Sequence, residues 1–159
     1  MTYVGLRQHT WSPVLRELAP DEATTATCFA NQLHNHTGIA VREGQVYVFE
    51  VDGSQKWKDG TIECGPDGWS RADQELGMSE FFIWMHEDNR RHPKANWFEI
   101  LGSIGRDDRT AFRVLEHTPG RDRPLQIGAS GELFLFANDL PDRYDNNAGV
   151  MRVTIRRVS

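Results

Sequence analysis

Apolar and polar residues alternate along several short stretches of this sequence, most clearly near the C-terminus. Residues 150–158 carry two interleaved sets, the apolar Met151, Val153 and Ile155 and the polar Arg152, Thr154 and Arg156. Successive side chains of a strand point to opposite faces of its sheet. The alternation therefore predicts a strand that buries the apolar set and exposes the polar set. Residues 132–137 predict the strand before it, since leucines alternate there with Phe134 and Phe136.

Shorter stretches of the same kind predict further strands. Residues 37–41 and 45–51 flank the turn Arg42-Glu43-Gly44, which predicts a β-hairpin. Strands are also expected at 97–104, 111–116 and 125–127, separated by turn-forming Asp, Gly and Pro residues. Only residues 21–32 and 79–87 could hold a helical turn or two. So many short strands predict an all-β fold, an antiparallel β-sandwich.

No internal repeat, low-complexity tract or linker divides the sequence, and 159 residues is about the length of one domain. We therefore expect a single β-sandwich domain over residues 1–159. Two long segments, 52–78 and 87–96, interrupt the strands, and loops of such length are usually functional or disordered. Trp57 and Trp69 argue against simple disorder in the first. The second is highly charged, and we expect a solvated insertion.

The charge and composition exclude several classes of partner. A net charge of −5 gives no electrostatic reason for binding nucleic acid or an anionic membrane. No apolar run is long enough to span a bilayer, and no signal peptide is recognisable, which predicts a cytoplasmic protein or one exported without such a signal. Cys28 and Cys64 match no zinc-binding spacing. Two unpaired, partly buried thiols are favoured over one disulfide.

The connection at 138–150 carries unusually many side-chain oxygens. Six residues supply them: Asn138, Asp139, Asp142, Asp145, Asn146 and Asn147. A calcium ion takes six to eight oxygen ligands from carboxylates, amides and main-chain carbonyls, although the spacing here is not that of an EF-hand. From composition alone, an ordinary Asn/Asp-rich turn without an ion is the favoured interpretation.

The sequence NDLPDRYDNNAGVMRVTI, residues 138–155, resembles the C-terminal calcium motif of the PA-IL-like (LecA-like) galactose-binding lectins. GELFLFAND and LGSIG are similar to two strands of that family, residues 36–53 to its N-terminal hairpin, and GPDG to one of its turns. The resemblance implies a galactose-binding-domain-like sandwich of the jelly-roll type. It also implies that calcium is the cofactor and a carbohydrate is the partner.

Position by position, the resemblance implies a set of calcium ligands. Asp139 is the carboxylate ligand, and Asn146 and Asn147 contribute side-chain carbonyls. Main-chain oxygens come from Arg143 and from the loop after the N-terminal hairpin, where Trp57 is the aligned residue, to within a residue or two. Two coordination positions are then left for vicinal hydroxyls of a sugar.

The sugar-binding residues depart from the family. Galactose-binding members place a histidine and a glutamine after the GP-x-G turn, whereas GPDGWSRADQEL has no histidine. Gln74 and Asp73, with Ser70 and Arg71, are the candidates for hydrogen bonds to the sugar, and Trp69 is the candidate for stacking on it. The sugar, galactose-like or another glycan, therefore stays open. So does the oligomeric state, a homo-oligomer included.

Other candidate sites are weaker. His34 and His36 would share one face of a strand, as a small metal site requires, but no third ligand is identifiable. His86, Glu87, Asp88 and His92 are charged loop residues, for which solvation is more common than acid–base chemistry.

The sequence has no nucleophile elbow, P-loop or dinucleotide fingerprint, so we do not expect an enzyme. Three classes remain open. The resemblance favours a calcium-dependent carbohydrate-binding protein. The alternatives are a structural or interaction sandwich, with calcium for stability or with no ion, and an enzyme that uses residues 87–92.

Overall fold

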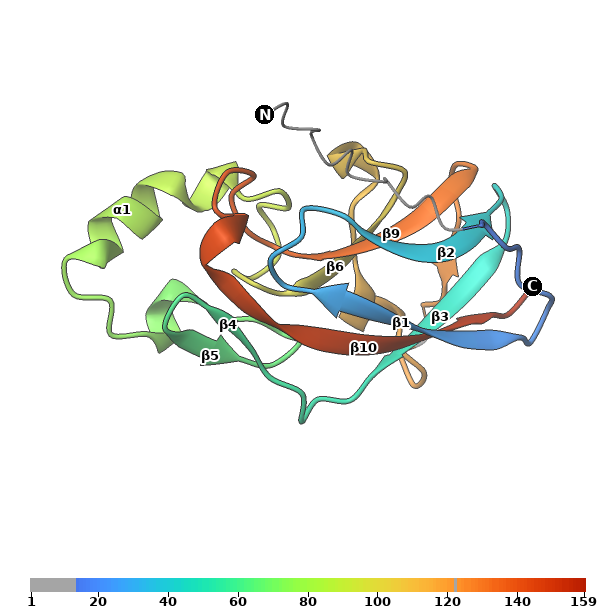
Figure 1. Ribbon diagram of the computed structural model, residues 1–159, viewed down its shortest axis with the longest axis horizontal. Helices are drawn as coiled ribbons and strands as arrows, with labels where there is room; N and C mark the ends of the chain where they lie inside the picture. Colours follow the sequence, from blue (N-terminus) through green and yellow to red (C-terminus); the bar gives the residue numbers. More distant parts are fainter. Residues whose placement is uncertain (1–13, 122) are drawn as a thin grey trace, which may run out of the picture.

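The alternation near the C-terminus forms the central strand of the larger of two antiparallel sheets (Figure 1). In this computed structural model, which describes residues 14–121 and 123–159, the strand is β10 (Asn147–Arg157). Met151, Val153 and Ile155 are fully buried, while Arg152 is exposed and Thr154 and Arg156 are partly exposed. The burial predicted for this strand is confirmed.

The two sheets face each other as a β-sandwich, which confirms the predicted fold class. The larger sheet has the order β5-β4-β10-β3-β8, with β1 also paired to β10, and the smaller has the order β2-β9-β6-β7. The remaining strands of the larger sheet are β1 (Ala23–Phe29), β3 (Val46–Val51), β4 (Trp57–Asp59), β5 (Ile62–Cys64) and β8 (Leu125–Gln126). The strands of the smaller sheet are β2 (Asn35–Val41), β6 (Ile100–Ile104), β7 (Phe112–Arg113) and β9 (Gly131–Ala137).

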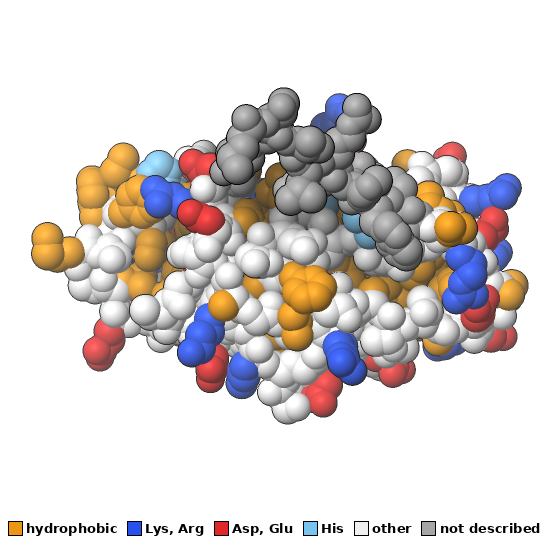
Figure 2. Space-filling model, viewed as in Figure 1, with side chains coloured by type: hydrophobic (Ala, Val, Ile, Leu, Met, Phe, Trp, Pro, Cys, Tyr) orange, Lys and Arg blue, Asp and Glu red, His pale blue; other side chains and the backbone are white. Residues whose placement is uncertain are grey.

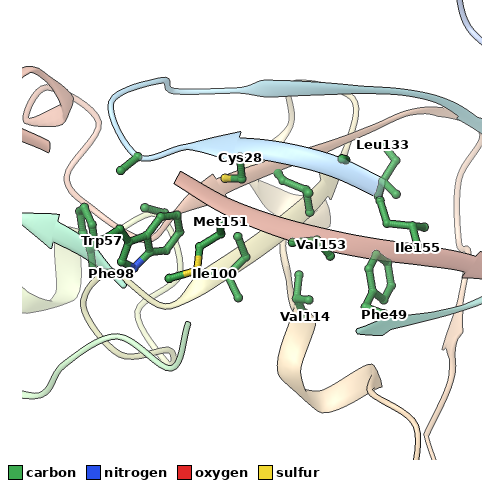
Figure 3. Close-up of a cluster of buried hydrophobic side chains, with 14 of the residues drawn as sticks. Cys28, Phe49, Trp57, Phe98, Ile100, Val114, Leu133, Met151, Val153 and Ile155 are labelled. Atoms are coloured by element: carbon green, nitrogen blue, oxygen red, sulfur yellow. The ribbon is translucent and has the colours of Figure 1, made fainter. Parts of the chain in front are cut away.

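Helical structure is confined to short elements. Helix α1 (Ser79–His86) lies where a helical turn was expected. The 3-10 turns are η1 (Arg71–Asp73), η2 (Glu87–Asn89), η3 (Asp108–Thr110), η4 (Val114–His117) and η5 (Tyr144–Asn146). Figure 3 shows the core between the sheets, where Met151, Val153 and Ile155 meet Ile100 and Leu133.

Two of the predicted elements are wrong. Residues 37–41 and 45–51 form no hairpin, because β2 pairs with β9 and β3 pairs with β10 and β8. The turn between them carries the chain from one sheet to the other. In residues 21–32 the chain forms strand β1 (Ala23–Phe29) and no helix. Ala26 and Cys28 are buried there between exposed threonines, and β-branched threonine favours an extended backbone.

Two other strands are shorter than predicted. The strand expected at 97–104 is reduced to β6, because Phe98 has a φ of 63°, which does not continue a strand. Of the strand expected at 111–116 only β7 pairs with β6, and the 3-10 turn η4 follows it.

The two long segments are more ordered than the sequence indicated. Residues 52–78 include the antiparallel pair β4 and β5, and both tryptophans of the segment are buried. In residues 87–96 the side chain of Arg91 is buried, so the expectation of a wholly solvated insertion is wrong. Cys28 and Cys64 are buried and unpaired, as predicted. Within the part of the chain that the structure describes, no helix is sufficiently long and apolar to span a membrane.

Candidate functional site

The oxygen-rich connection follows β9 and ends at the start of β10, beside the β4–β5 pair and α1 at one end of the molecule (Figure 1). Its first residue has a structural role. The buried Asn138 side chain donates to the main-chain oxygens of His92 and Asn96, at 3.0 and 2.9 Å, and accepts from the His92 amide at 3.0 Å. Asn138 therefore fastens the connection to the 87–96 segment.

Asp139 is a buried carboxylate without a cationic partner. Only 3% of its surface is exposed. Its Oδ1 accepts from the Leu140 amide at 2.7 Å, and its Oδ2 accepts from the Asn147 Nδ2 at 3.0 Å. No lysine, arginine or histidine of residues 14–121 and 123–159 forms a salt bridge with it. Burial first, and the negative charge of Asp59 second, raise the pKa of Asp139 to about 7.

Asn147 carries a buried oxygen with no hydrogen-bond donor. Its Nδ2 group donates to Asp139 and to the Ala30 main-chain oxygen, each at 3.0 Å. Its Oδ1 atom is buried and has no partner among the described residues. Buried acceptors are nearly always satisfied, and a buried oxygen without a donor beside a buried carboxylate fits the oxygen ligands that a cation takes.

Asp59 is the site residue that the sequence did not identify. It lies directly opposite Asn147 in the β4–β10 pair. Its Oδ2 accepts from the Trp69 Nε1 at 3.0 Å, and burial raises its pKa. The spacing of Trp57 and Asp59 along one strand could have indicated it, but the residues around β4 gave no strand signal.

Asp59 and Asp139 line a pocket of about 220 Å³, and Asn147 lies next to it through its hydrogen bond to Asp139. Its lining comprises Asp59, Ile62, Trp69, Ser79, Phe82, Ile83, Trp97, Asp139, Leu140, Arg143 and Asn146. One wall is therefore the inner side of α1. Figure 2 shows apolar side chains gathered at the α1 end of the molecule, where Phe81, Trp84 and Met85 are exposed.

The remaining predicted calcium ligands lie at or near this pocket. Asn146, at the end of η5, is exposed and lines the pocket, and Arg143 lines it just before η5. Trp57 is buried, pairs with Gly149 and Cys64, and does not line the pocket. Asp59, two residues further along β4, does line the pocket.

The predicted sugar-binding residues separate into two groups. Trp69 lines the pocket, but it is 4% exposed and stacks on Trp97 with ring centroids 5.7 Å apart. Asp73 and Gln74 lie outside the pocket lining. Asp73 accepts instead from the Ser70 hydroxyl at 2.6 Å, and Arg71 faces the carboxylates of Glu80 and Glu87.

The histidine pair forms no metal site. His34 contacts Arg91 at 2.9 Å, and His36 contacts Glu132 at 2.9 Å. Among the described residues no three His, Cys, Asp or Glu side chains gather as a metal-binding group. An ion in the pocket would therefore rely on amide and main-chain oxygens in addition to the carboxylates of Asp59 and Asp139.

Comparison with known proteins shows the fold. No family model matches the sequence, and no curated protein matches it. Among solved structures, the chain is similar to one described as "EclA N-terminal domain; PllA-like lectin". The sequence identity is 18%, the match covers 85% of this chain and 94% of that one, and the TM-score is 0.52. The likeness supports the β-sandwich fold and does not single out the LecA-like family.

Proposed function

We propose that the protein binds carbohydrate through a calcium ion held between the 138–147 connection and β4. Asp139 supplies a carboxylate, Asn146 and Asn147 supply amide oxygens, and Arg143 supplies a main-chain oxygen. Calcium favours such a mixed oxygen set and tolerates irregular geometry. Hydroxyls of a sugar would complete the coordination.

The observation that carries the proposal is the meeting of Asp139 and Asn147. A buried carboxylate without a cation and a buried amide oxygen without a donor belong to side chains that touch each other. Burying either group unpaired is costly. One divalent cation would compensate both, whereas a water molecule could donate to both oxygens but would leave the charge of the carboxylate unbalanced.

Two features support a carbohydrate as the ligand. The fold is similar to that of a structure described as a lectin. The pocket also reaches solvent beside the exposed Asn146, so an ion held there would keep positions where water can exchange for a diol. The same features support a binding protein over an enzyme.

A second function has its own supporting observation. Asp73 and Gln74 lie outside the pocket, and Trp69 is already stacked on Trp97. An ion that only joins β4 to β10 would need none of them. In this alternative, calcium stabilises a structural or interaction sandwich and no sugar enters.

A glycan array with the intact protein, in calcium and again in excess chelator, tests the proposal. We expect binding to a limited set of glycans in calcium and loss of that binding in chelator. Glycan binding that persists in chelator would overturn the role of calcium. Calcium binding without any bound glycan would favour the structural alternative.

A further inference from the structure

We infer that Asp59 is a second carboxylate ligand of the ion, held in position by the indole N–H of Trp69. This inference rests on the proposed calcium site and deepens it. The resemblance to lectins implies only one carboxylate, Asp139, and a main-chain oxygen in the segment where Asp59 lies. In this chain we expect the same segment to supply a charged ligand, the side-chain carboxylate of Asp59.

The strand register places Asp59 at the site. Asn147, Ala148 and Gly149 of β10 lie opposite Asp59, Lys58 and Trp57 of β4. Directly opposed residues of an antiparallel pair point to the same face, with Cβ atoms about 5 Å apart. Asp59 and Asn147 therefore project together, and Asn147 is in turn hydrogen-bonded to Asp139.

The amide oxygen of Asn147 is a second, independent indication that Asp59, Asn147 and Asp139 bind a ligand. Two neighbouring carboxylates alone are not a binding site. Asn147 is 95% buried, since only 5% of its surface is exposed, and its Oδ1 has no donor in the described chain. It belongs to the side chain that is paired with Asp59 across the strands and hydrogen-bonded to Asp139. A cation there would have three oxygen ligands, the neutral amide oxygen of Asn147 and the carboxylates of Asp59 and Asp139.

Trp69 accounts for the orientation of Asp59. Its Nε1 donates to one carboxylate oxygen at 3.0 Å, which leaves the other oxygen available to an ion. Stacking on Trp97 and burial hold the indole in place. Groups that orient a metal ligand in this way typically change metal affinity by about 10- to 100-fold when they are removed.

A second carboxylate has two consequences of opposite sign. It strengthens calcium binding, because affinity rises with the ligand charge. Without the ion, it repels Asp139 and destabilises the fold. Replacement of Asp59 by the isosteric asparagine should therefore weaken calcium binding and leave the metal-free protein equally stable or more stable. If Asp59 had only a structural role, Asp59→Asn would instead make the metal-free protein less stable.

The test is calcium titration by calorimetry of the wild type, Asp59→Asn and the control Asp142→Asn, an exposed carboxylate of the same connection. We expect Asp59→Asn to weaken binding at least about tenfold and the control to match the wild type. Thermal unfolding in chelator should show no loss of stability for Asp59→Asn.

The outcomes separate this inference from the proposed function. If the wild type binds no calcium, the proposed function itself fails. If the wild type binds and Asp59→Asn binds equally well, only the role of Asp59 is overturned.

Tryptophan fluorescence gives an independent reading. Calcium should change the emission of the wild type and of Trp84→Phe, which removes an exposed tryptophan of α1. It should change the emission much less in Trp69→Phe. An equal calcium-induced change in Trp69→Phe would contradict a link from Trp69 to the ion.

Discussion

Arg91 and Asp139 are both buried charges beside the 138–147 connection, but their surroundings differ. Arg91 donates to both carboxylate oxygens of Asp108, between 2.8 and 3.2 Å, and to the Tyr144 hydroxyl at 2.9 Å. Its guanidinium also lies 3.4 Å from the centroid of the Phe136 ring. Asp139 accepts only from uncharged donors, is repelled by Asp59, and has only a weaker attraction from Arg143, which forms no salt bridge with it.

The difference separates a charge that has its structural partners from one that, in the proposed site, would take a cation. A buried charge whose partners are complete holds the fold together, as Arg91 does by joining the 87–96 segment to η5 through Tyr144. A buried charge that lacks its opposite charge destabilises the fold unless a ligand supplies it. The connection is thus anchored on one side by Arg91, and its other side carries the buried carboxylate that the proposed ion would meet.

The largest effect on stability should come from Arg91→Ala. It removes a buried charge with several partners, so we expect a loss of about 3 kcal/mol, near the lower end of the range for broken buried pairs because Asp108 is partly exposed. Urea unfolding in chelator measures it. Arg109→Ala, which removes an exposed arginine paired with Asp107, is the matched control and should change stability by less than about 0.5 kcal/mol. Equal losses of stability in Arg91→Ala and Arg109→Ala would show that the buried partners of Arg91 add nothing to the stability of the fold.

The second effect is a pH dependence of the metal-free protein. The pKa of Asp139 is about 7 in the folded state, and an unfolded aspartate has a pKa of about 3.9. Between these values the folded state holds a proton that unfolding releases. Stability contributed by this group therefore falls as pH rises from about 4 to about 7, and then stays constant.

Asp139→Asn isolates that contribution. Melting temperatures in chelator should show the variant gaining stability relative to the wild type as pH rises across this window. Saturating calcium should cancel the gain by stabilising the ionised wild type. A difference that shrinks as pH rises would contradict the unpaired state of this carboxylate.

Gly149→Ala should have a smaller effect. Gly149 has a φ of 98°, and a Cβ there would approach the Trp57 Cβ to 2.9 Å and its Cα to 3.0 Å. We expect a loss of about 2 kcal/mol and weaker calcium binding, because the contact pushes β4 away from β10 and so moves Asp59 relative to Asn147. Gly128→Ala, where a Cβ meets nothing within 4 Å, is the control. If Gly149→Ala is less stable but binds calcium with unchanged affinity, the register between β4 and β10 does not position the ligands.

The smallest effect is expected for Asp145→Asn. This carboxylate lies in the same connection as Asp139 but is exposed. Its replacement should change stability by less than about 0.5 kcal/mol and leave calcium binding unchanged. A large change in calcium affinity would mean that nearby exposed charge, and not the buried pair, governs the site.

The sequence predicted most reliably what short-range patterns determine. The burial of Met151, Val153 and Ile155 followed from alternation alone, and α1 lies where a helical turn was expected. Which strands pair with each other depends on residues far apart in the sequence, so local patterns do not determine it. The core-facing residues Ile39 and Tyr47 fit a hairpin as well as two facing sheets, and only the packed structure decides between these arrangements.

The residues that the proposed site brings together could be recognised from the sequence only in part, for the same reason. Asp139, Asn146 and Asn147 lie within nine consecutive residues, so their pattern was visible. Asp59 reaches them through the β4–β10 pairing, from a segment rich in glycine and aspartate that read as an irregular loop. Asn138, by contrast, shared the composition of the ion-binding candidates but bonds to the 87–96 main chain.

Calcium calorimetry on the wild type and Asp139→Ala tests the central claim most directly. Asp142→Ala is the control, because it removes an exposed carboxylate three residues away. We expect one calcium ion bound by the wild type and by the control, and no calcium-dependent heat for Asp139→Ala. Absence of heat in the wild type, or an unchanged titration of Asp139→Ala, would show that the connection is a turn and not an ion site.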